Sequence, residues 1–251
     1  MNKLQGQVAI VTGGGQGVGL GVALSLAAAG ANIVITGRQE DKLRKAADTI
    51  SAHGVEVLTI VGDTRKRASA TETVAATIAR FGRLDILVNN AQSSTPGVAL
   101  ENIDDATIAL TLESGLLGTL YYMQAGFPHL KQRGGSIINL GSREGIHGGA
   151  GFGIYSATKE GIRGLSRTAA REWGKYDIRV NVICPAALSP AAVEYLDKHP
   201  DEAKAYLAEI ALGRFGDPQQ DIGPIAVFLA SADSRYLTGQ TLNADGGQMM
   251  L

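Results

Sequence analysis

Short runs of apolar residues alternate along the chain with longer stretches in which apolar and polar residues follow helical spacing. An unbroken apolar run is typical of a strand buried on both faces, as in a parallel sheet. Strands are expected at 8–11, 32–36, 55–61, 84–88, 136–140, 178–183 and 241–244. Helices are expected at 18–29, 41–53, 67–81, 104–131, 154–174 and 219–231.

This alternation predicts an α/β fold, in which a single doubly wound parallel sheet of about seven strands is flanked by helices. No linker divides residues 1–251, so we expect one domain. Two regions interrupt the pattern. The helical stretch 104–131 contains Ser114-Gly115, and because glycine inside a helix costs up to about 1 kcal/mol, close packing or a bend is expected there. Residues 186–216 are irregular, and we expect them to form a substrate loop.

Composition and charge exclude several classes of function. The chain has 251 residues and a formal net charge of -1, without a long block of one sign. Nucleic acid and anionic membrane surfaces are therefore not expected as partners. No apolar run is long enough to cross a membrane and no signal peptide is recognisable, so we expect a cytoplasmic protein. Cys184 is the single cysteine and the histidines lack ligand spacing, so neither a disulfide within the chain nor a metal site is expected.

A glycine-rich turn joins the first expected strand to the first expected helix. It has the spacing Gly13-x-x-x-Gly17-x-Gly19. Glycines let backbone N–H groups approach a pyrophosphate, and a helix N-terminus favours its negative charge. We therefore expect a dinucleotide cofactor at this turn, although a turn that only packs against the sheet would look similar. The expected contacts are Gly13, Gln16, Gly17, Val18 and Gly19.

The second expected strand ends at Gly37-Arg38. An acidic residue at this place binds the ribose 2′-hydroxyl of NAD, whereas an arginine accommodates the 2′-phosphate of NADP. Arg38 therefore favours NADP, unless it is only a solvated loop cation. A parallel sheet binds its ligand at the carboxyl ends of its strands, which makes further residues at or shortly after strand ends candidates for cofactor contacts. These residues are Asp63, Thr64, Asn89, Ala91, Pro185 and Leu188.

Tyr155 and Lys159 are four residues apart in the helix expected at 154–174, so they share one face of it. A phenol has a pKa of about 10, and a shift of about 3 units, or about 4 kcal/mol, would let it exchange protons near neutrality. One positive charge about 4 Å away supplies about 4 kcal/mol at an effective dielectric constant of about 20. Ser142 follows the fifth expected strand and should lie at the same edge of the sheet. The Tyr-x-x-x-Lys spacing alone also occurs by chance.

The sequence resembles the short-chain dehydrogenase/reductase family over nearly its whole length. The resemblance rests on the glycine turn, Asp63, Asn89-Asn90-Ala91, Ser142, Tyr155-x-x-x-Lys159 and Asp245-Gly246-Gly247. It implies a Rossmann-type fold and an oxidoreductase. Tyr155 would exchange a proton with the substrate oxygen, Lys159 would lower the pKa of Tyr155 and bind the nicotinamide ribose, and Ser142 would hold the substrate carbonyl. The resemblance also implies that Asp63 contacts the adenine and Asn89 the adenosine part of the cofactor.

Three positions depart from the family pattern. Gln92 stands where a glycine usually follows Asn-Asn-Ala, and Gly115 stands where the family often has a catalytic asparagine. A water relay would then depend on the Gly115 carbonyl. After the sixth expected strand, Ala186 replaces a glycine and the usual threonine is missing, with Ser189 as a substitute. The family pattern therefore does not predict which residues contact the nicotinamide carboxamide.

The leading hypothesis is an NADP(H)-dependent carbonyl reductase that transfers a hydride between the cofactor and a ketone or secondary alcohol, with NADPH favoured over NADH. Its alternatives are an NAD-linked secondary-alcohol or hydroxysteroid dehydrogenase and, in another class, a non-catalytic sensor that binds NADP.

Substrate contacts are expected from residues around the serine and the tyrosine. They are Ser142, Arg143, Glu144, His147, Phe152 and Tyr155. A mainly apolar or small neutral ketone fits the surrounding loops better than a polyanion. The resemblance also implies a homotetramer or homodimer, and the apolar stretch 106–130 is compatible with burial at such an interface.

Overall fold

The computed structural model describes residues 2–187, 193 and 196–250, and at its centre lies one sheet of seven parallel strands. The strands are β1 (Val8–Thr12), β2 (Asn32–Gly37), β3 (Val57–Val61), β4 (Ile86–Asn89), β5 (Gly135–Leu140), β6 (Ile178–Pro185) and β7 (Thr241–Ala244). Their order in the sheet is β3-β2-β1-β4-β5-β6-β7. The predicted doubly wound parallel sheet is confirmed.

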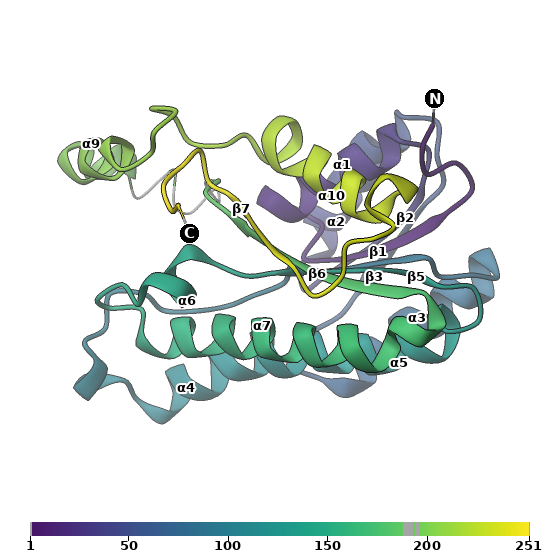
Figure 1. The fold of residues 1–251 in the computed structure, drawn as a ribbon, viewed down its shortest axis with the longest axis horizontal. Coiled ribbons are helices and arrows are strands. Elements are labelled where there is room, and N and C mark those ends of the chain that lie inside the picture. The colour runs from purple at the N-terminus through teal and green to yellow at the C-terminus, as the bar shows by residue number, and fades with distance from the viewer. Residues whose placement is uncertain (1, 188–192, 194–195, 251) are drawn as a thin grey trace.

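Helices cover both faces of this sheet (Figure 1). One layer holds α1 (Gly17–Ala28), α2 (Glu40–Ser51) and α10 (Gly223–Ala230). The other holds α3 (Arg67–Phe81), α4 (Asp105–Leu112), α5 (Gly118–Leu130) and α7 (Gly153–Trp173). The short α6 (Arg143–His147) and α9 (Pro200–Ala208) lie at one end of the molecule, toward the carboxyl ends of β5 and β6 (Figure 1). None of the helices in the described part of the chain is long and apolar enough to cross a membrane.

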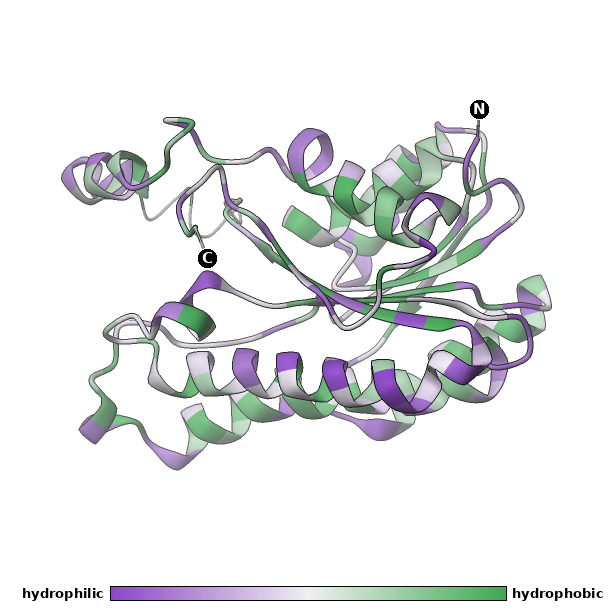
Figure 2. Ribbon diagram, in the orientation of Figure 1, coloured by the Kyte–Doolittle hydropathy of each residue, from purple (hydrophilic) through white to green (hydrophobic). Residues whose placement is uncertain are grey.

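Alternate residues of the central strands pack into opposite layers, because side chains along a strand point to alternate faces. In β1, Ala9 and Val11 join the apolar layer formed with α1 and α10, whereas Val8 and Ile10 join the layer formed with α3 and α5. Figure 2 shows the hydrophobic strands between the two helical layers, and hydrophilic residues recurring along α7. Both faces are buried, which explains why these strands appear in the sequence as unbroken apolar runs.

The strand order reverses between β1 and β4, and Thr12 joins these two strands at their carboxyl ends. Its hydroxyl accepts hydrogen bonds from the backbone N–H groups of Asn90 and Ala91, both at 3.0 Å. The Asn90 side chain donates in return to the Thr12 carbonyl at 2.9 Å. Such a reversal leaves a crevice in which α/β proteins bind their ligands. The turn that follows Thr12 is therefore fixed at the edge of this crevice.

The expected helix 104–131 is divided into three parts. A π turn, η2 (Glu113–Leu117), separates α4 from α5 and contains Ser114 and Gly115, where the sequence predicted an interruption. A second π turn, η4 (Pro218–Ile222), precedes α10. Short π turns inside helices are frequent at functional sites, because they change the direction of the side chains that follow.

Two further regions differ from the sequence pattern. The glycine-rich stretch after Ser142 begins with the short helix α6, which the pattern did not predict because its five residues are too few to show helical spacing. In the irregular stretch 186–216, Pro200 begins α9, and Ala187 pairs with Gly216 in an isolated parallel bridge. This bridge holds the two ends of the expected substrate loop together.

Close packing of α1 on η4 gives a test of the fold. A Cβ atom at Gly21 would lie 2.3 Å from the backbone carbonyl carbon of Pro218. We expect Gly21→Ala to lower the free energy of unfolding by about 1–3 kcal/mol, because two backbones must move apart. Gly164→Ala in α7 is the matched control, since its nearest neighbour is the Arg167 Nη2 atom at 4.0 Å. That variant should be neutral or up to about 1 kcal/mol more stable. Urea unfolding measures both, and equal effects would contradict the predicted packing.

Candidate functional site

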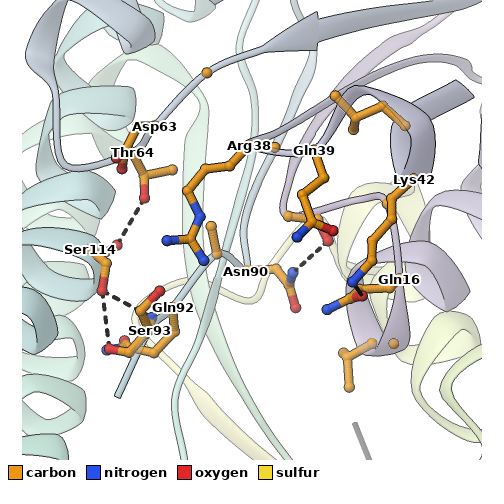
Figure 3. A pocket seen from close by; sticks show the side chains of 18 residues that line it. Gln16, Arg38, Gln39, Lys42, Asp63, Thr64, Asn90, Gln92, Ser93 and Ser114 are labelled. Carbon is orange, nitrogen blue, oxygen red and sulfur yellow. Dashed lines mark hydrogen bonds between the residues drawn. The ribbon is translucent and has the colours of Figure 1, made fainter. Parts of the chain in front are cut away.

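A pocket of about 370 Å³ lies at the carboxyl ends of β1 to β4, at the crevice between the two halves of the sheet (Figure 3). Its lining includes these predicted residues: Gly13, Gln16, Gly17, Val18, Arg38, Asp63, Thr64 and Ala91. Gly19, Asn89 and Pro185 are not among the residues that line it, and Leu188 lies outside the described residues. Most of the predicted cofactor residues are thus brought together, although they come from four different strand ends.

The glycine turn has the backbone that a phosphate-binding turn needs. Gly13 and Gly17 have positive φ values of 66° and 55°, a conformation that only glycine adopts readily. A Cβ atom at Gly19 would lie 2.4 Å from the Gly13 carbonyl oxygen, so this glycine lets α1 approach the turn instead of lining the pocket. The pocket is therefore bordered by bare backbone and by the N-terminus of α1. These features fit the pyrophosphate of a dinucleotide.

Two cations lie at the β2 side of the pocket. Arg38 follows β2 and extends into the pocket, and Lys42 from the first turn of α2 reaches the Gln16 side chain, its Nζ 2.6 Å from Gln16 Oε1 (Figure 3). The three residues that end β2 and follow it are Gly37, Arg38 and Gln39, so no carboxylate occupies this strand end. Lys42 was not among the predicted residues. The available signal was a second cation four residues after Arg38, in the first turn of α2.

Asp63 is held at the end of β3 by Arg65. The Arg65 Nη2 atom lies 2.6 Å from Asp63 Oδ2, and the Arg65 backbone N–H donates to Oδ1 at 3.0 Å. The hydrogen bond from the Arg65 side chain is the main reason why the pKa of Asp63 is lowered, although burial opposes it. Asp63 therefore presents an ionised carboxylate with a fixed orientation at the β3 edge of the pocket.

The two asparagines after β4 have different positions. Asn89 is buried and donates from Nδ2 to Asn139 Oδ1 on the neighbouring strand β5 at 2.8 Å, so its side chain lies against the face of the sheet. Asn90 lines the pocket. Its side chain also donates to the Gly13 carbonyl at 3.3 Å, which ties the glycine turn to β4. Asn90 was not among the predicted site residues, and sequence spacing alone does not show which of two neighbouring asparagines faces the ligand.

Lys159 and Tyr155 lie on one face of α7, as their spacing predicted. The Lys159 ammonium is buried, donates to the Leu140 carbonyl at the end of β5 at 2.9 Å, and lies 5.5 Å from the centre of the Tyr155 ring. Ser142 begins α6, and its hydroxyl accepts a hydrogen bond from the Glu144 backbone N–H at 3.1 Å. The same hydroxyl interacts with the Tyr155 phenol and lowers its pKa. The three residues proposed for catalysis are therefore in direct or near contact.

Burial controls the acidity of this pair. It raises the pKa of the Tyr155 phenol, and the hydrogen bond with Ser142 offsets part of that rise. Burial also lowers the pKa of the Lys159 ammonium to about 8. The spacing of the two residues predicted that the lysine charge lowers the tyrosine pKa, but spacing does not include the cost of moving both groups out of water. Here that cost is larger, and the site needs further favourable interactions with the charged forms of both groups.

The residues predicted to contact substrate surround Tyr155 unevenly. The centres of the Phe152 and Tyr155 rings lie 5.9 Å apart. Both residues border a small cavity together with Thr95 and Val98. The Arg143 Nη1 atom lies 2.8 Å from Glu209 Oε2 at the end of α9, and 3.8 Å from Glu144 Oε1. His147 is exposed in the last turn of α6. Phe152 is therefore placed beside the Tyr155 ring, whereas Arg143 joins α6 to α9.

No group of three or more potential ligands among the His, Cys, Asp and Glu side chains of residues 2–187, 193 and 196–250 could hold a metal ion. Cys184 is buried and its pKa is raised to about 11, mainly by that burial. A thiol of this kind is a poor nucleophile near neutrality. Cys184 is therefore not a candidate nucleophile of this site.

A crevice bordered by a glycine turn at the strand ends, together with a buried tyrosine–lysine pair on α7, is typical of a nucleotide-dependent oxidoreductase. A family model described as enoyl-(acyl carrier protein) reductase matches residues 13–249. The chain belongs to the short-chain dehydrogenase/reductase family, and it is a dehydrogenase or reductase that acts on CH–OH groups with a nicotinamide dinucleotide.

Characterised relatives and solved structures cover nearly the whole chain. It is 42% identical to a 12α-hydroxysteroid dehydrogenase from Clostridium sp., over 98% of both chains. It is 37% identical to a trans-4-hydroxycyclohexanecarboxylate dehydrogenase from Sinomonas cyclohexanicum, over 96% of this chain and 92% of that one. The structure of levodione reductase has a TM-score of 0.92 at 30% identity, over 98% of both chains. NAD⁺-bound xylitol dehydrogenase also has a TM-score of 0.92, at 28% identity over 98% of this chain and 100% of that one.

The buried charge of Lys159 predicts a pH-dependent effect on stability. The pKa of this lysine is about 8 in the folded protein and 10.5 when unperturbed. Below pH 8 Lys159 is protonated in both the folded and the unfolded protein, and the folded protein bears the full cost of burying its charge. Between pH 8 and 10.5 only the unfolded state keeps the proton, so stability rises with pH. We expect Lys159→Met to raise the free energy of unfolding at pH 7 by on the order of 2 kcal/mol.

This gain should shrink as the pH rises from 8 toward 10.5. Chemical unfolding at several pH values measures it. Lys45→Met on the exposed side of α2 is the control, and it should change the free energy of unfolding at pH 7 by less than about 0.5 kcal/mol. A loss of stability for Lys159→Met at pH 7 would mean that the hydrogen bond to Leu140 outweighs the cost of burying the charge.

Proposed function

We propose that this protein transfers a hydride between NADP(H) and a ketone or secondary alcohol, and acts as a carbonyl reductase. The observation that carries the proposal is the buried Lys159 ammonium beside the Tyr155 ring, together with the Ser142 hydroxyl, which lowers the pKa of the same phenol. A protein that only binds a nucleotide has no need to bury a charge next to a phenol, since that burial is costly. The sensor hypothesis is therefore the weaker one.

The three side chains have separate tasks in the proposed reaction. The Tyr155 O–H donates its proton to the substrate oxygen during reduction and takes it back during oxidation. The Ser142 hydroxyl donates a hydrogen bond to the same oxygen, where negative charge develops. The Lys159 ammonium stabilises the phenolate that remains on Tyr155. The bound cofactor supplies or accepts the hydride.

NADP is favoured by the charges at the β2 side of the pocket. Arg38 and Lys42 offer two cations where the 2′-substituent of the adenosine ribose is expected, and Gly37 leaves room beside them. A carboxylate at this strand end, which NAD-dependent proteins use for the 2′-hydroxyl, is replaced by Arg38. Asp63 with its partner Arg65 lies on the other side of Arg38, at the expected adenine.

A hydroxysteroid is the second candidate for the substrate. The observation in its favour is that two relatives, at 42% and 31% identity over 98% of this chain, are 12α- and 7α-hydroxysteroid dehydrogenases. Val98, Ile103 and Phe152 border the small cavity beside Tyr155, and these apolar side chains suit a rigid ring system. A homodimer or homotetramer and a cytoplasmic location stay predictions.

Tyr155→Phe tests the proposed chemistry. The variant keeps the ring and loses the proton that the substrate oxygen requires, so kcat should fall by about 100- to 10,000-fold. NADPH binding, measured by fluorescence titration, should change by less than about twofold, because the ring keeps its place in the site. The assay follows NADPH absorbance with cyclic ketones and oxosteroids. Tyr236→Phe is the control, since this tyrosine is fully exposed. Unchanged turnover in Tyr155→Phe would refute the mechanism.

Arg38→Ala and Lys42→Ala test the cofactor preference. A hydrogen bond to a charged group contributes about 1.5–3 kcal/mol, so each substitution should raise the KM for NADPH by about ten- to a hundredfold. The KM for NADH should stay nearly constant, because NADH has no 2′-phosphate. Arg44→Ala provides the matched control: Arg44 is an exposed arginine of α2 that pairs with Asp41 outside the pocket. An unchanged ratio of the two KM values in Arg38→Ala would show that Arg38 does not select NADP.

A further inference from the structure

Tyr122 is a fully buried tyrosine of α5 whose hydroxyl is hydrogen-bonded to α3. The phenol oxygen lies 3.1 Å from Thr73 Oγ1. Thr73 Oγ1 in turn donates to the Ser69 carbonyl in the first turn of α3 at 2.7 Å. A threonine hydroxyl has a single O–H, and Thr73 uses it on Ser69, so the Tyr122 O–H is the donor to Thr73. The three groups form one chain of hydrogen bonds from α5 to the beginning of α3.

The same phenol faces the carboxyl end of β2. Thr36 and Val34 point to one face of this strand, and Val34 packs in the apolar layer that contains Tyr122. Thr36 Oγ1 makes no well-formed hydrogen bond within the described residues, but its hydroxyl interacts with the Tyr122 phenol. Burial raises the pKa of this phenol, and the Thr73 and Thr36 hydroxyls offset part of the rise. The phenol therefore lies between the end of β2 and the beginning of α3.

The end of β2 supports one side of the pocket. The Thr36 carbonyl accepts a hydrogen bond from the Gly13 N–H at 2.8 Å, which attaches the glycine turn to this strand end. The next carbonyl, that of Gly37, accepts from the Gly62 N–H at 2.9 Å and attaches β3. Arg38 follows directly and extends into the pocket (Figure 3). The position of Thr36 thus influences both the phosphate-binding turn and the cation.

Ser69 supports the end of β3 in a similar way. Its hydroxyl accepts a hydrogen bond from the Asp63 backbone N–H at 3.2 Å, while its carbonyl is bound by Thr73. Gly62 lets this support come close, because a Cβ atom there would lie 3.1 Å from Thr36 Oγ1 and 3.4 Å from Ser69 Cβ. Both strand ends on this side of the pocket are therefore held from behind by groups that interact with Tyr122.

We propose that Tyr122 is a positioning residue for the adenosine half of the cofactor: its buried hydroxyl fixes the ends of β2 and β3, and with them Arg38 and Asp63, without touching the ligand. The proposal rests on the proposed function, which assigns these two residues to the adenosine. A phenylalanine would bury the same ring without burying a hydroxyl, so apolar packing alone does not account for this tyrosine. Binding sites keep their geometry when hydrogen bonds behind them hold their residues in place.

Tyr122→Phe removes the hydroxyl and keeps the ring. The KM for NADPH should rise by about five- to tenfold, because a lost buried hydrogen bond loosens the strand ends that carry the pocket. The kcat at saturating NADPH should change by less than about twofold, since the groups that transfer the proton lie on α7 and after β5. Tyr121→Phe is the matched control on the same helix. It keeps the ring under the Arg67 guanidinium, 4.3 Å from the ring centre, and should change neither constant.

Two fragments of the cofactor separate positioning from a general loss of structure, and they need no substrate. ADP carries the adenine, its ribose and the pyrophosphate, and nicotinamide mononucleotide carries the other half. In isothermal titration calorimetry, Tyr122→Phe should raise the Kd of ADP by about five- to tenfold and that of nicotinamide mononucleotide by less than about twofold. If the Kd of ADP is unchanged, or if both values rise alike, the proposal is overturned and Tyr122 only packs.

Thr73 tests the same chain of hydrogen bonds from α3. Thr73→Val replaces the hydroxyl with a methyl group and should raise the Kd of ADP as much as Tyr122→Phe does. Thr73→Ser keeps the hydroxyl, so the Kd of ADP should stay within about twofold of its original value. Equal values in the valine and serine variants would contradict the assignment. Thermal unfolding checks that each variant is folded, and the Thr73 pair decides the question if Tyr122→Phe does not fold.

The outcomes separate this proposal from the proposed function. If the unmodified protein transfers no hydride to any carbonyl but the Kd of ADP still responds to Tyr122→Phe, the proposed function fails and the role of Tyr122 stands. If turnover is normal and the Kd of ADP does not respond, the role of Tyr122 fails and the proposed function stands.

Discussion

The positive charge of Lys159 is buried between α7 and the sheet, and much of the surrounding structure serves to keep it there. An ammonium out of water is costly unless acceptors replace its hydration. Leu140 at the end of β5 supplies one acceptor. Ser166 lies on α7 seven residues after Lys159, and it accepts a hydrogen bond from Asn139 of β5 at 2.8 Å. Asn139 in turn accepts a hydrogen bond from Asn89 of β4. This chain of polar contacts sets the register of α7 on the sheet, and with it the position of Tyr155.

The site has two halves that different physical features create. The first half lies at the ends of β1 to β3 and suits phosphate groups. It consists of exposed glycine backbone, a helix N-terminus and the cations Arg38 and Lys42. At the ends of β5 and β6, burial dominates, and it moves the pKa values of Tyr155 and Lys159 away from their solution values. The loop after β4 lies between the halves. Thr12 and Asn90 connect it to the first, and Gln92 and Ser93 connect it to the helix bend beside the second.

Positions 92 and 115 show how a side chain from a loop can fill the space beside a helix glycine. A glycine at 115 removes a side chain from the helix, and the glutamine at 92 fills the vacated space from the loop side. Read along the chain, the two positions are separate departures from the family pattern. In space they are one contact, since the Gln92 amide lies over Gly115.

The sequence by itself determined the parallel sheet, the glycine turn and the shared face of Tyr155 and Lys159, because these depend on local periodicity and on the conformational freedom of glycine. It also located Arg38 and Ser142 at strand ends. Only the tertiary structure decided which of Asn89 and Asn90 faces the pocket, since that depends on how β4 packs against β1 and β5.

The tertiary structure also decided that burial raises the pKa of Tyr155. It brought Lys42 and Gln92 into the lining of the pocket. Desolvation and the meeting of distant residues depend on the whole packed molecule, and a pattern of neighbouring residues does not contain them.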